Sequence, residues 1–180
     1  MRNKQALIEK SRGFPPVVGF EPLVLVLGSL PGRASLGARE YYAQPRNAFW
    51  AIMGALCGAR PELSYSERLE ALQQSGVALW DVLYEAARPG SLDSSIVRAS
   101  QRINDVAGLI ARHKSIALVA FNGKKSAEIF GRHIEPALTG SDVATATLPS
   151  TSPAHAAVSR EQKLDHWRRV VAPHLRPKSE

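Results

Sequence analysis

The sequence predicts an α/β fold in which helices cover both faces of a mostly parallel β-sheet. Short apolar segments alternate along the chain with segments of helical pattern, and this order produces parallel strands joined by helical crossovers. Four segments have strand character: residues 23–27, 76–83, 116–121 and, more weakly, 143–148. The chain has 180 residues, of which 44% are apolar, and this suits a domain with a substantial hydrophobic core.

The chain begins with a basic segment, residues 1–20, and we expect a single domain over residues 21–180. The segment 23–27 reads Leu-Val-Leu-Val-Leu. A continuous apolar run of this length is typical of a strand that is buried on both faces of a parallel sheet.

Helices are predicted between the strands from their start signals. Asn47 can cap a helix over residues 48–57, and Ser64 with Glu67 three residues later makes a capping box for the next one. Three further helices are expected: residues 106–112 after Asn104 or Asp105, residues 124–130 after Asn122 and Gly123, and a last helix capped by Ser159 with Gln162.

Composition narrows the class of partner. The chain carries 23 Lys and Arg residues against 16 Asp and Glu residues, a formal net charge of +7. Cationic surfaces attract phosphate backbones, so nucleic acid is a candidate partner, with a generic basic surface as the alternative. Cys57 is the single cysteine, which excludes an intrachain disulfide, and no His/Cys cluster has zinc spacing. No membrane-spanning run or signal peptide is evident, so we expect a cytoplasmic protein.

The functional site is expected in the loops that follow the strands. In parallel α/β sheets, ligands bind beyond the carboxyl ends of the strands. The loops at those ends are residues 28–46, 84–95, 122–123 and 149–156, and they are also the most polar, Gly-, Pro- and Ser-rich stretches of the chain.

The first two candidate features lie in the loop after the first strand. The run Gly28-Ser29-Leu30-Pro31-Gly32 permits tight turns and close approach of a ligand to main-chain N–H groups, although a plain turn is an equal alternative. The run from Tyr41 to Trp50 is rich in aromatic side chains, which can stack on nucleobases, whereas Phe49 is better explained as core.

Two further features follow later strands. Asp81 interrupts an apolar strand, so its carboxylate should be hydrogen-bonded, face a ligand, or form a structural salt bridge, for which Arg88 is the candidate. The run from Leu148 to His155 supplies hydroxyl groups and a histidine at the end of the fourth strand, a composition that suits a phosphate.

Taken together, these segments resemble the uracil-DNA glycosylase superfamily. The motifs, in order, are GSLPG, YYAQPRNAFW, GVALWDVL, GSLDSSI and LPSTSPAH, and they are most similar to the hypoxanthine-DNA (deoxyinosine) glycosylase branch. The resemblance covers residues 23–175. It implies a three-layer αβα sandwich around a four-stranded parallel sheet, base flipping, and hydrolysis of the N-glycosidic bond without a metal or cofactor.

The resemblance also implies roles for individual residues. Asn47 and Asn122 are the expected catalytic residues, with Asn47 positioning the water or the base. Asp81 occupies the position of a base-reading Asn, Tyr42 is expected to stack on the base, and Ser29 and Leu30 shape the pocket. The residues expected to hold the DNA are Ser150, Ser152 and His155.

Two positions depart from the superfamily pattern. Many relatives carry Asp or Asn where this chain has Leu30, and many carry His where it has Leu148. Neither leucine can hold a water molecule or stabilise a leaving base.

The preferred interpretation is a monomeric DNA glycosylase for deaminated bases, hypoxanthine first and uracil second. A catalytically inactive nucleic-acid- or lesion-binding module is the alternative that the two leucines favour. A small-molecule hydrolase lacks support, because no Ser/His/Asp arrangement has nucleophile-elbow spacing.

Overall fold

The main sheet has four parallel strands, as the sequence predicts. The structure is a computed structural model that describes residues 10–177. The strand order is β3-β2-β6-β7, so the order reverses at β2, the arrangement that opens a crevice at the carboxyl ends. The strands are β2 (Val24–Gly28), β3 (Val77–Asp81), β6 (Leu118–Asn122) and β7 (Ala144–Leu148).

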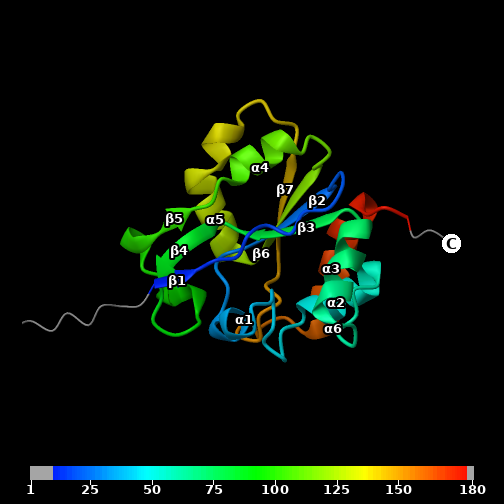
Figure 1. The fold of residues 1–180 in the computed structure, drawn as a ribbon, viewed down its shortest axis with the longest axis horizontal. Helices are drawn as coiled ribbons and strands as arrows, with labels where there is room; N and C mark the ends of the chain where they lie inside the picture. Colours follow the sequence, from blue (N-terminus) through cyan, green and yellow to red (C-terminus); the bar gives the residue numbers. More distant parts are fainter. Residues whose placement is uncertain (1–9, 178–180) are drawn as a thin grey trace, which may run out of the picture.

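Helices cover both faces of this sheet, so the predicted three-layer αβα sandwich is confirmed. One face is covered by α2 (Phe49–Cys57), α3 (Tyr65–Gln74) and α6 (Arg160–Val171). The other is covered by α4 (Val106–Arg112) and α5 (Lys124–His133) (Figure 1). The two faces of β2 contribute alternate residues to two separate cores, Val24 and Val26 to one and Leu25 and Leu27 to the other.

The predicted strand over residues 76–83 is wrong in its C-terminal part. β3 ends at Asp81, and Leu83 begins a new strand, β4 (Leu83–Ala87), in a second, antiparallel sheet of order β1-β4-β5. The outer strands of that sheet are β1 (Lys10–Arg12) and β5 (Arg102–Ile103). A continuous apolar run does not mark the point at which a chain changes sheets, so this division was not visible in the sequence.

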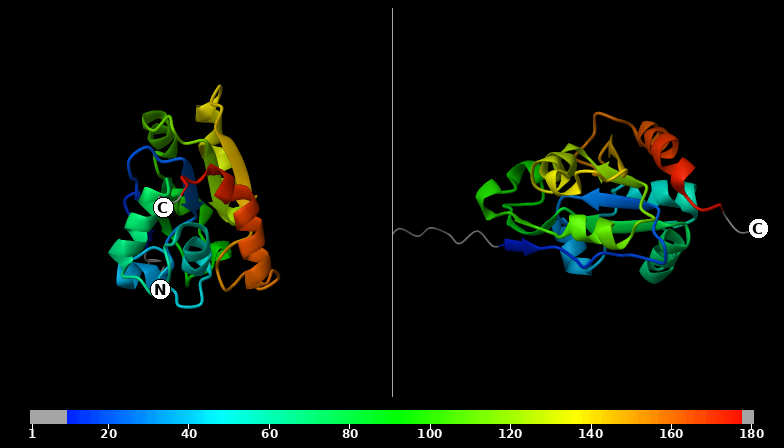
Figure 2. Two further views of the ribbon diagram at one scale, coloured as in Figure 1. Left: turned by 90° about the vertical axis from the view of Figure 1, so that its right-hand side faces the viewer. Right: turned by 90° about the horizontal axis from the view of Figure 1, so that it is seen from above.

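The described part of the basic segment 1–20 packs against the domain. Lys10–Arg12 pairs with β4, and Val17 makes a bridge to Leu79. Figure 2 shows this second sheet at the end of the molecule away from α2, α3 and α6. Residues 1–9 and 178–180 lie outside the described residues, and the domain boundary at residue 21 stays a prediction.

Local capping chemistry explains where several helices begin. Ser64 with Glu67 and Ser159 with Gln162 both form complete capping boxes, and Asp105 accepts a hydrogen bond from the Gly108 N–H. The prediction for α2 was one residue early, because Ala48 is its N-cap and the helix starts at Phe49. A short helix, α1 (Arg33–Ala38), was not predicted within the loop after β2.

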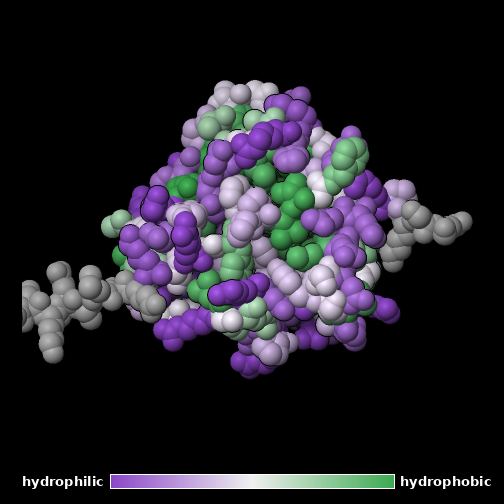
Figure 3. Space-filling view, viewed as in Figure 1, coloured by the Kyte–Doolittle hydropathy of each residue, from purple (hydrophilic) through white to green (hydrophobic). Residues whose placement is uncertain are grey.

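The surface of the domain is largely polar. On the face shown in Figure 3, hydrophilic side chains surround a limited apolar area. Within residues 10–177, no helix has both the length and the apolar character needed to cross a bilayer.

Candidate active site

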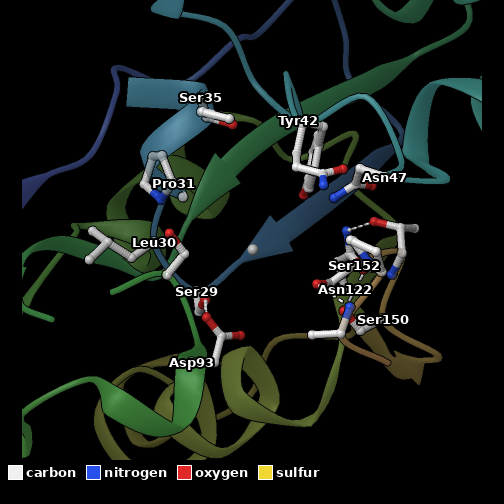
Figure 4. A pocket seen from close by; sticks show the side chains of 18 of the residues that line it. Ser29, Leu30, Pro31, Ser35, Tyr42, Asn47, Asp93, Asn122, Ser150 and Ser152 are labelled. Atoms are coloured by element: carbon white, nitrogen blue, oxygen red, sulfur yellow. Dashed lines mark hydrogen bonds between the residues drawn. The ribbon is translucent and has the colours of Figure 1, made fainter. Parts of the chain in front are cut away.

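A pocket of about 490 Å³ lies at the carboxyl ends of the strands, where the sequence predicts the site. This volume is in the range of small-molecule and cofactor sites. Its lining comes from the ends of β2, β3 and β6 and from the loops that follow β2, β4 and β7 (Figure 4). Of the nine predicted site residues, eight line it: Ser29, Leu30, Tyr42, Asn47, Asp81, Asn122, Ser150 and Ser152.

Asp81 is a deeply buried group in the pocket lining. Its side chain is 3% exposed, and it lies beside Gly28 in the register of β2 and β3. A Cβ atom on Gly28 would approach Oδ1 of Asp81 to 2.4 Å and the hydroxyl oxygen of Tyr42 to 3.3 Å. Gly28 is therefore the residue that makes room for a carboxyl group between two apolar strands.

The electrostatic environment favours the neutral form of Asp81. Burial, followed by repulsion from Asp93, raises the pKa of Asp81 from 3.8 to about 7, and the nearby Arg88 guanidinium opposes this shift. Oδ2 is buried without a hydrogen-bond partner among the described residues. A buried polar atom without a partner is costly, so this oxygen is available to a ligand.

The salt bridge between Arg88 and Asp81, one of the alternatives that the sequence left open, is not formed among the described residues. Its guanidinium is buried and donates to the main-chain carbonyl groups of Leu30, at 3.0 Å, and Pro31, and it lies 4.0 Å from Oδ1 of Asp93. Arg88 therefore fastens the loop after β2 to the loop after β4.

Asn47 and Tyr42 enter the pocket from the loop that leads into α2. Oδ1 of Asn47 accepts a hydrogen bond from the Phe49 N–H at 3.0 Å, so its orientation is fixed at the start of the helix. Its Nδ2 has no hydrogen-bond partner among the described residues, and Figure 4 shows the side chain directed into the pocket. The amide donor of Asn47 is thus the part left for a ligand.

Tyr42 is held by aromatic stacking. Its ring stacks on Phe49 with centroids 3.9 Å apart and an interplanar angle of 23°. Burial and the charge of Asp81 raise the pKa of Tyr42, and a side-chain hydrogen bond with Asn122 opposes that shift. One face of the ring is therefore already used, and a base could stack only on the other.

Asn122 fastens the loop after β7 to the end of β6. Its Oδ1 accepts from the Thr151 N–H and its Nδ2 donates to the Thr151 hydroxyl, both at 2.8 Å. Gly123 follows with φ +102°, and a Cβ atom there would lie 3.0 Å from Cβ of Ser150. Both ends of the Asn122 amide bond to Thr151, and its side chain also interacts with Tyr42, an arrangement typical of a positioning residue.

The same loop is held from α6. Nζ of Lys163, which is 5% exposed, donates to the Ser152 carbonyl at 3.2 Å, and the Trp167 indole N–H donates to the Pro149 carbonyl at 3.0 Å. Burial lowers the pKa of Lys163, with a smaller contribution from Arg160. No sequence motif singles out Lys163. A lysine in a helix pattern gives no signal that its ammonium group will be buried.

Three features of the pocket mouth differ from the prediction. His155 is half-buried and does not belong to the pocket lining. Exposed Arg33 contributes to the lining, and so does Asp93, which accepts a hydrogen bond from the Ser29 hydroxyl at 2.7 Å. Asp93 belongs to the motif GSLDSSI, which was the available signal for it. In the described part of the chain, no group of three or more His, Cys, Asp or Glu residues is placed to hold a metal ion.

The fold and the pocket together define the class of protein: a doubly wound α/β domain with a polar ligand site where the strand order reverses. The comparisons with known proteins define it further. A family model described as "Uracil DNA glycosylase superfamily" matches residues 15–176. The chain belongs to this superfamily, as the motifs predict.

Similar proteins cover almost the whole domain. The chain is 36% identical to "Hypoxanthine DNA glycosylase" from Methanosarcina acetivorans over 160 residues, which are 88% of this chain and 96% of that protein. It is 38% identical over 147 residues to the protein of the same name from Methanosarcina barkeri, covering 81% of this chain and 89% of that protein.

A solved structure confirms the fold. The solution NMR structure of a candidate uracil DNA glycosylase from Methanosarcina acetivorans matches with a TM-score of 0.76 and 34% identity. The match covers 92% of this chain and 98% of the other.

Replacing Gly28 with alanine should destabilise the domain by about 1–3 kcal/mol, because the added methyl group overpacks the space held by Asp81. Gly32→Ala is the matched control. It lies in the loop that follows β2, and a Cβ there has no neighbour within 4 Å. Urea unfolding of both variants measures the difference. Adding Asp81→Ala to Gly28→Ala should recover part of the loss, and equal stability of the two single variants would contradict the packing argument.

The stability conferred by Asp81 should depend on pH. Because its folded pKa of about 7 lies above the ordinary value of 3.8, the folded state binds more protons between these values, and stability falls as pH rises toward 7. Relative to Asp81→Asn, the wild type should lose at most roughly 4 kcal/mol between pH 4 and pH 8. Urea unfolding of both proteins across this range gives the difference, and parallel curves would contradict the shift.

Proposed function

We propose that this protein is a DNA glycosylase that hydrolyses the N-glycosidic bond of deaminated bases and leaves an abasic site. Hypoxanthine is its first substrate and uracil its second. The observation that carries the proposal is the buried carboxyl group of Asp81, which lines the pocket of a superfamily member and has one oxygen without a partner among the described residues. The names of the two Methanosarcina relatives support hypoxanthine.

The cationic and hydroxyl groups that line the pocket suit a nucleotide that has been rotated out of the DNA helix. An enzyme that acts on a base within a duplex must rotate the nucleotide out of the stack into a pocket. The exposed Arg33 and Arg46 and the hydroxyl groups of Ser150 and Ser152 lie in the pocket lining. Together with the net charge of +7, they support contact with the phosphate backbone on either side of that nucleotide.

Asp81 suits the edge shared by both proposed bases. Hypoxanthine and uracil each present a ring N–H beside a carbonyl group, and a carboxyl group accepts a hydrogen bond from that N–H in either protonation state. In its neutral form, Asp81 also donates to the adjacent carbonyl oxygen, where negative charge develops as the base leaves. Because both bases share this edge, Asp81 alone does not choose between them.

Asn47 is the side-chain amide placed to donate to the substrate. Oδ1 is occupied by the Phe49 N–H, so the free group is the Nδ2 donor. This supports an interaction with the departing base rather than with an attacking water molecule, whose protons need an acceptor.

The proposal also includes a monomeric state for the protein.

The alternative is a lesion-binding module on the same fold, supported by Leu30 and Leu148 at positions where relatives carry polar groups. A cleavage panel separates the two functions. Oligonucleotides with hypoxanthine, uracil or xanthine, single-stranded or opposite each partner base, are incubated with excess protein and then treated with alkali to reveal abasic sites. We expect cleavage at hypoxanthine first. Tight binding without an alkali-labile product would establish the module instead.

Asn47→Asp and Asn47→Ala should both lower the single-turnover rate for hypoxanthine by about two orders of magnitude, because each removes the amide donor. Asn47→Asp keeps the acceptor for the Phe49 N–H and so should fold with nearly wild-type stability, whereas Asn47→Ala loses this hydrogen bond, worth about 1 kcal/mol. Rapid-quench kinetics and thermal melting give both quantities. If Asn47→Asp retains most of the activity, Asn47 holds water instead.

A further inference from the structure

The chemistry of the proposed reaction leaves one role without a residue. Hydrolysis needs an acceptor for the protons of the attacking water. Leu30 and Leu148, which stand where many superfamily members carry polar residues, cannot provide it. Leu30 is 5% exposed and Leu148 is 4% exposed, and their side chains belong to the two hydrophobic cores. The acceptor must therefore come from elsewhere in the pocket lining.

Two carboxyl groups line the pocket within residues 10–177, Asp81 and Asp93, and no histidine does. They lie at different depths. Asp81 is 3% exposed, whereas the side chain of Asp93 is 44% exposed and follows Leu92, which is 55% exposed. A flipped nucleotide enters with its base foremost, so its sugar stays nearer the mouth than the base. Of the two carboxyl groups, Asp93 is therefore the more exposed one, as expected of a group that acts beside the sugar.

Asp93 is held in place before any substrate arrives. Its Oδ1 accepts the Ser29 hydroxyl at 2.7 Å, a bond drawn in Figure 4, and lies 4.0 Å from Nη1 of Arg88. Arg88 is itself buried and anchored to the Leu30 and Pro31 carbonyl groups. Oδ2 of Asp93 has no hydrogen-bond partner among the described residues, so one oxygen is fixed and the other is open to water.

We propose that Asp93 is a catalytic residue whose free carboxylate oxygen binds the attacking water and accepts its proton. This inference rests on the proposed glycosylase function. The bond between C1′ and the base nitrogen breaks, and its electron pair stays on the base. The water oxygen bonds to C1′, and one water proton passes to Asp93 and from there to solvent. The base takes up one proton from solvent, so the products are the free base and an abasic site.

A carboxylate at the mouth of a DNA-binding site weakens DNA binding, and this effect can be tested. Negative charge there repels the phosphates that flank the flipped nucleotide, although Arg88 offsets part of it. Removing the charge should therefore improve DNA binding while it slows the chemical step. A residue that only supports the loop would change both properties in the same direction.

The test compares wild type with Asp93→Asn, in which the new amide oxygen can still accept the Ser29 hydroxyl. Asp142→Asn is the matched control, because it removes an exposed carboxylate before β7, at the opposite end of the sheet from the pocket. Single-turnover cleavage is measured on a duplex containing deoxyinosine, and binding on the same duplex with 2′-fluoro-2′-deoxyinosine, which resists cleavage. Melting temperature verifies the fold of each variant.

We expect Asp93→Asn to lower the single-turnover rate constant at least 100-fold, as for loss of a general base, with binding equal or several-fold tighter. Asp142→Asn should match wild type in rate. Sodium formate should partly restore the rate of Asp93→Ala, in which the carboxylate space is empty. An Asp93→Asn rate within threefold of wild type overturns the proposal, as does a parallel loss of rate and affinity. Wild type without abasic product would instead refute the glycosylase function and, with it, this role.

Discussion

The site depends on one unfavourable contact, the burial of the Asp81 carboxyl group at the end of an otherwise apolar strand. An unpaired carboxylate in such surroundings is expensive, and the structure reduces the cost in two ways. Gly28 opens the space for the group, and burial raises its pKa to about 7 so that it can be neutral. Oδ2 has no hydrogen-bond partner among residues 10–177, which costs stability, and the proposed base would supply an N–H donor to the group.

Other buried polar side chains hold the loops around Asp81 in place by hydrogen bonds. Arg88 holds the loop after β2 through its carbonyl groups, Asn122 holds the loop after β7 through Thr151, and Lys163 holds the same loop through Ser152. Asn122 ends β6, Lys163 lies on α6 and Arg88 directly follows β4, so each makes a long-range bond to a loop from a position on or next to a regular element. These buried hydrogen bonds favour one loop geometry, so the pocket is formed before a ligand binds.

Features set by neighbouring residues could be predicted from the sequence, and features set by distant residues could not. The capping boxes at Ser64 and Ser159 depend on a partner three residues away, so the helix starts were readable. The end of β3 at Asp81 depends on pairing with other strands and was missed. For the site, reasoning from the strand ends and from the family resemblance selected Ser29, Asn47 and Asp81, which line one pocket. It also selected His155, which lies just past the lining and whose contact with DNA stays a prediction, and it gave no hint that Arg88 would pair with main-chain carbonyl groups.

The two leucines that depart from the superfamily pattern explain why the polar groups lie where they do. Burying a leucine side chain stabilises a fold by about 1.5–3 kcal/mol, and Leu30 and Leu148 contribute to opposite cores, one on each face of the sheet. They therefore anchor the first and last loops of the pocket by packing. Leucine at positions 30 and 148 offers no polar atoms to the pocket. Polar contacts must therefore come from Asp81 at the end of β3, from Asn47 before α2 and from Asp93 at the mouth of the pocket. The leucines thus stabilise the fold around the pocket, and neighbouring residues supply its polar groups.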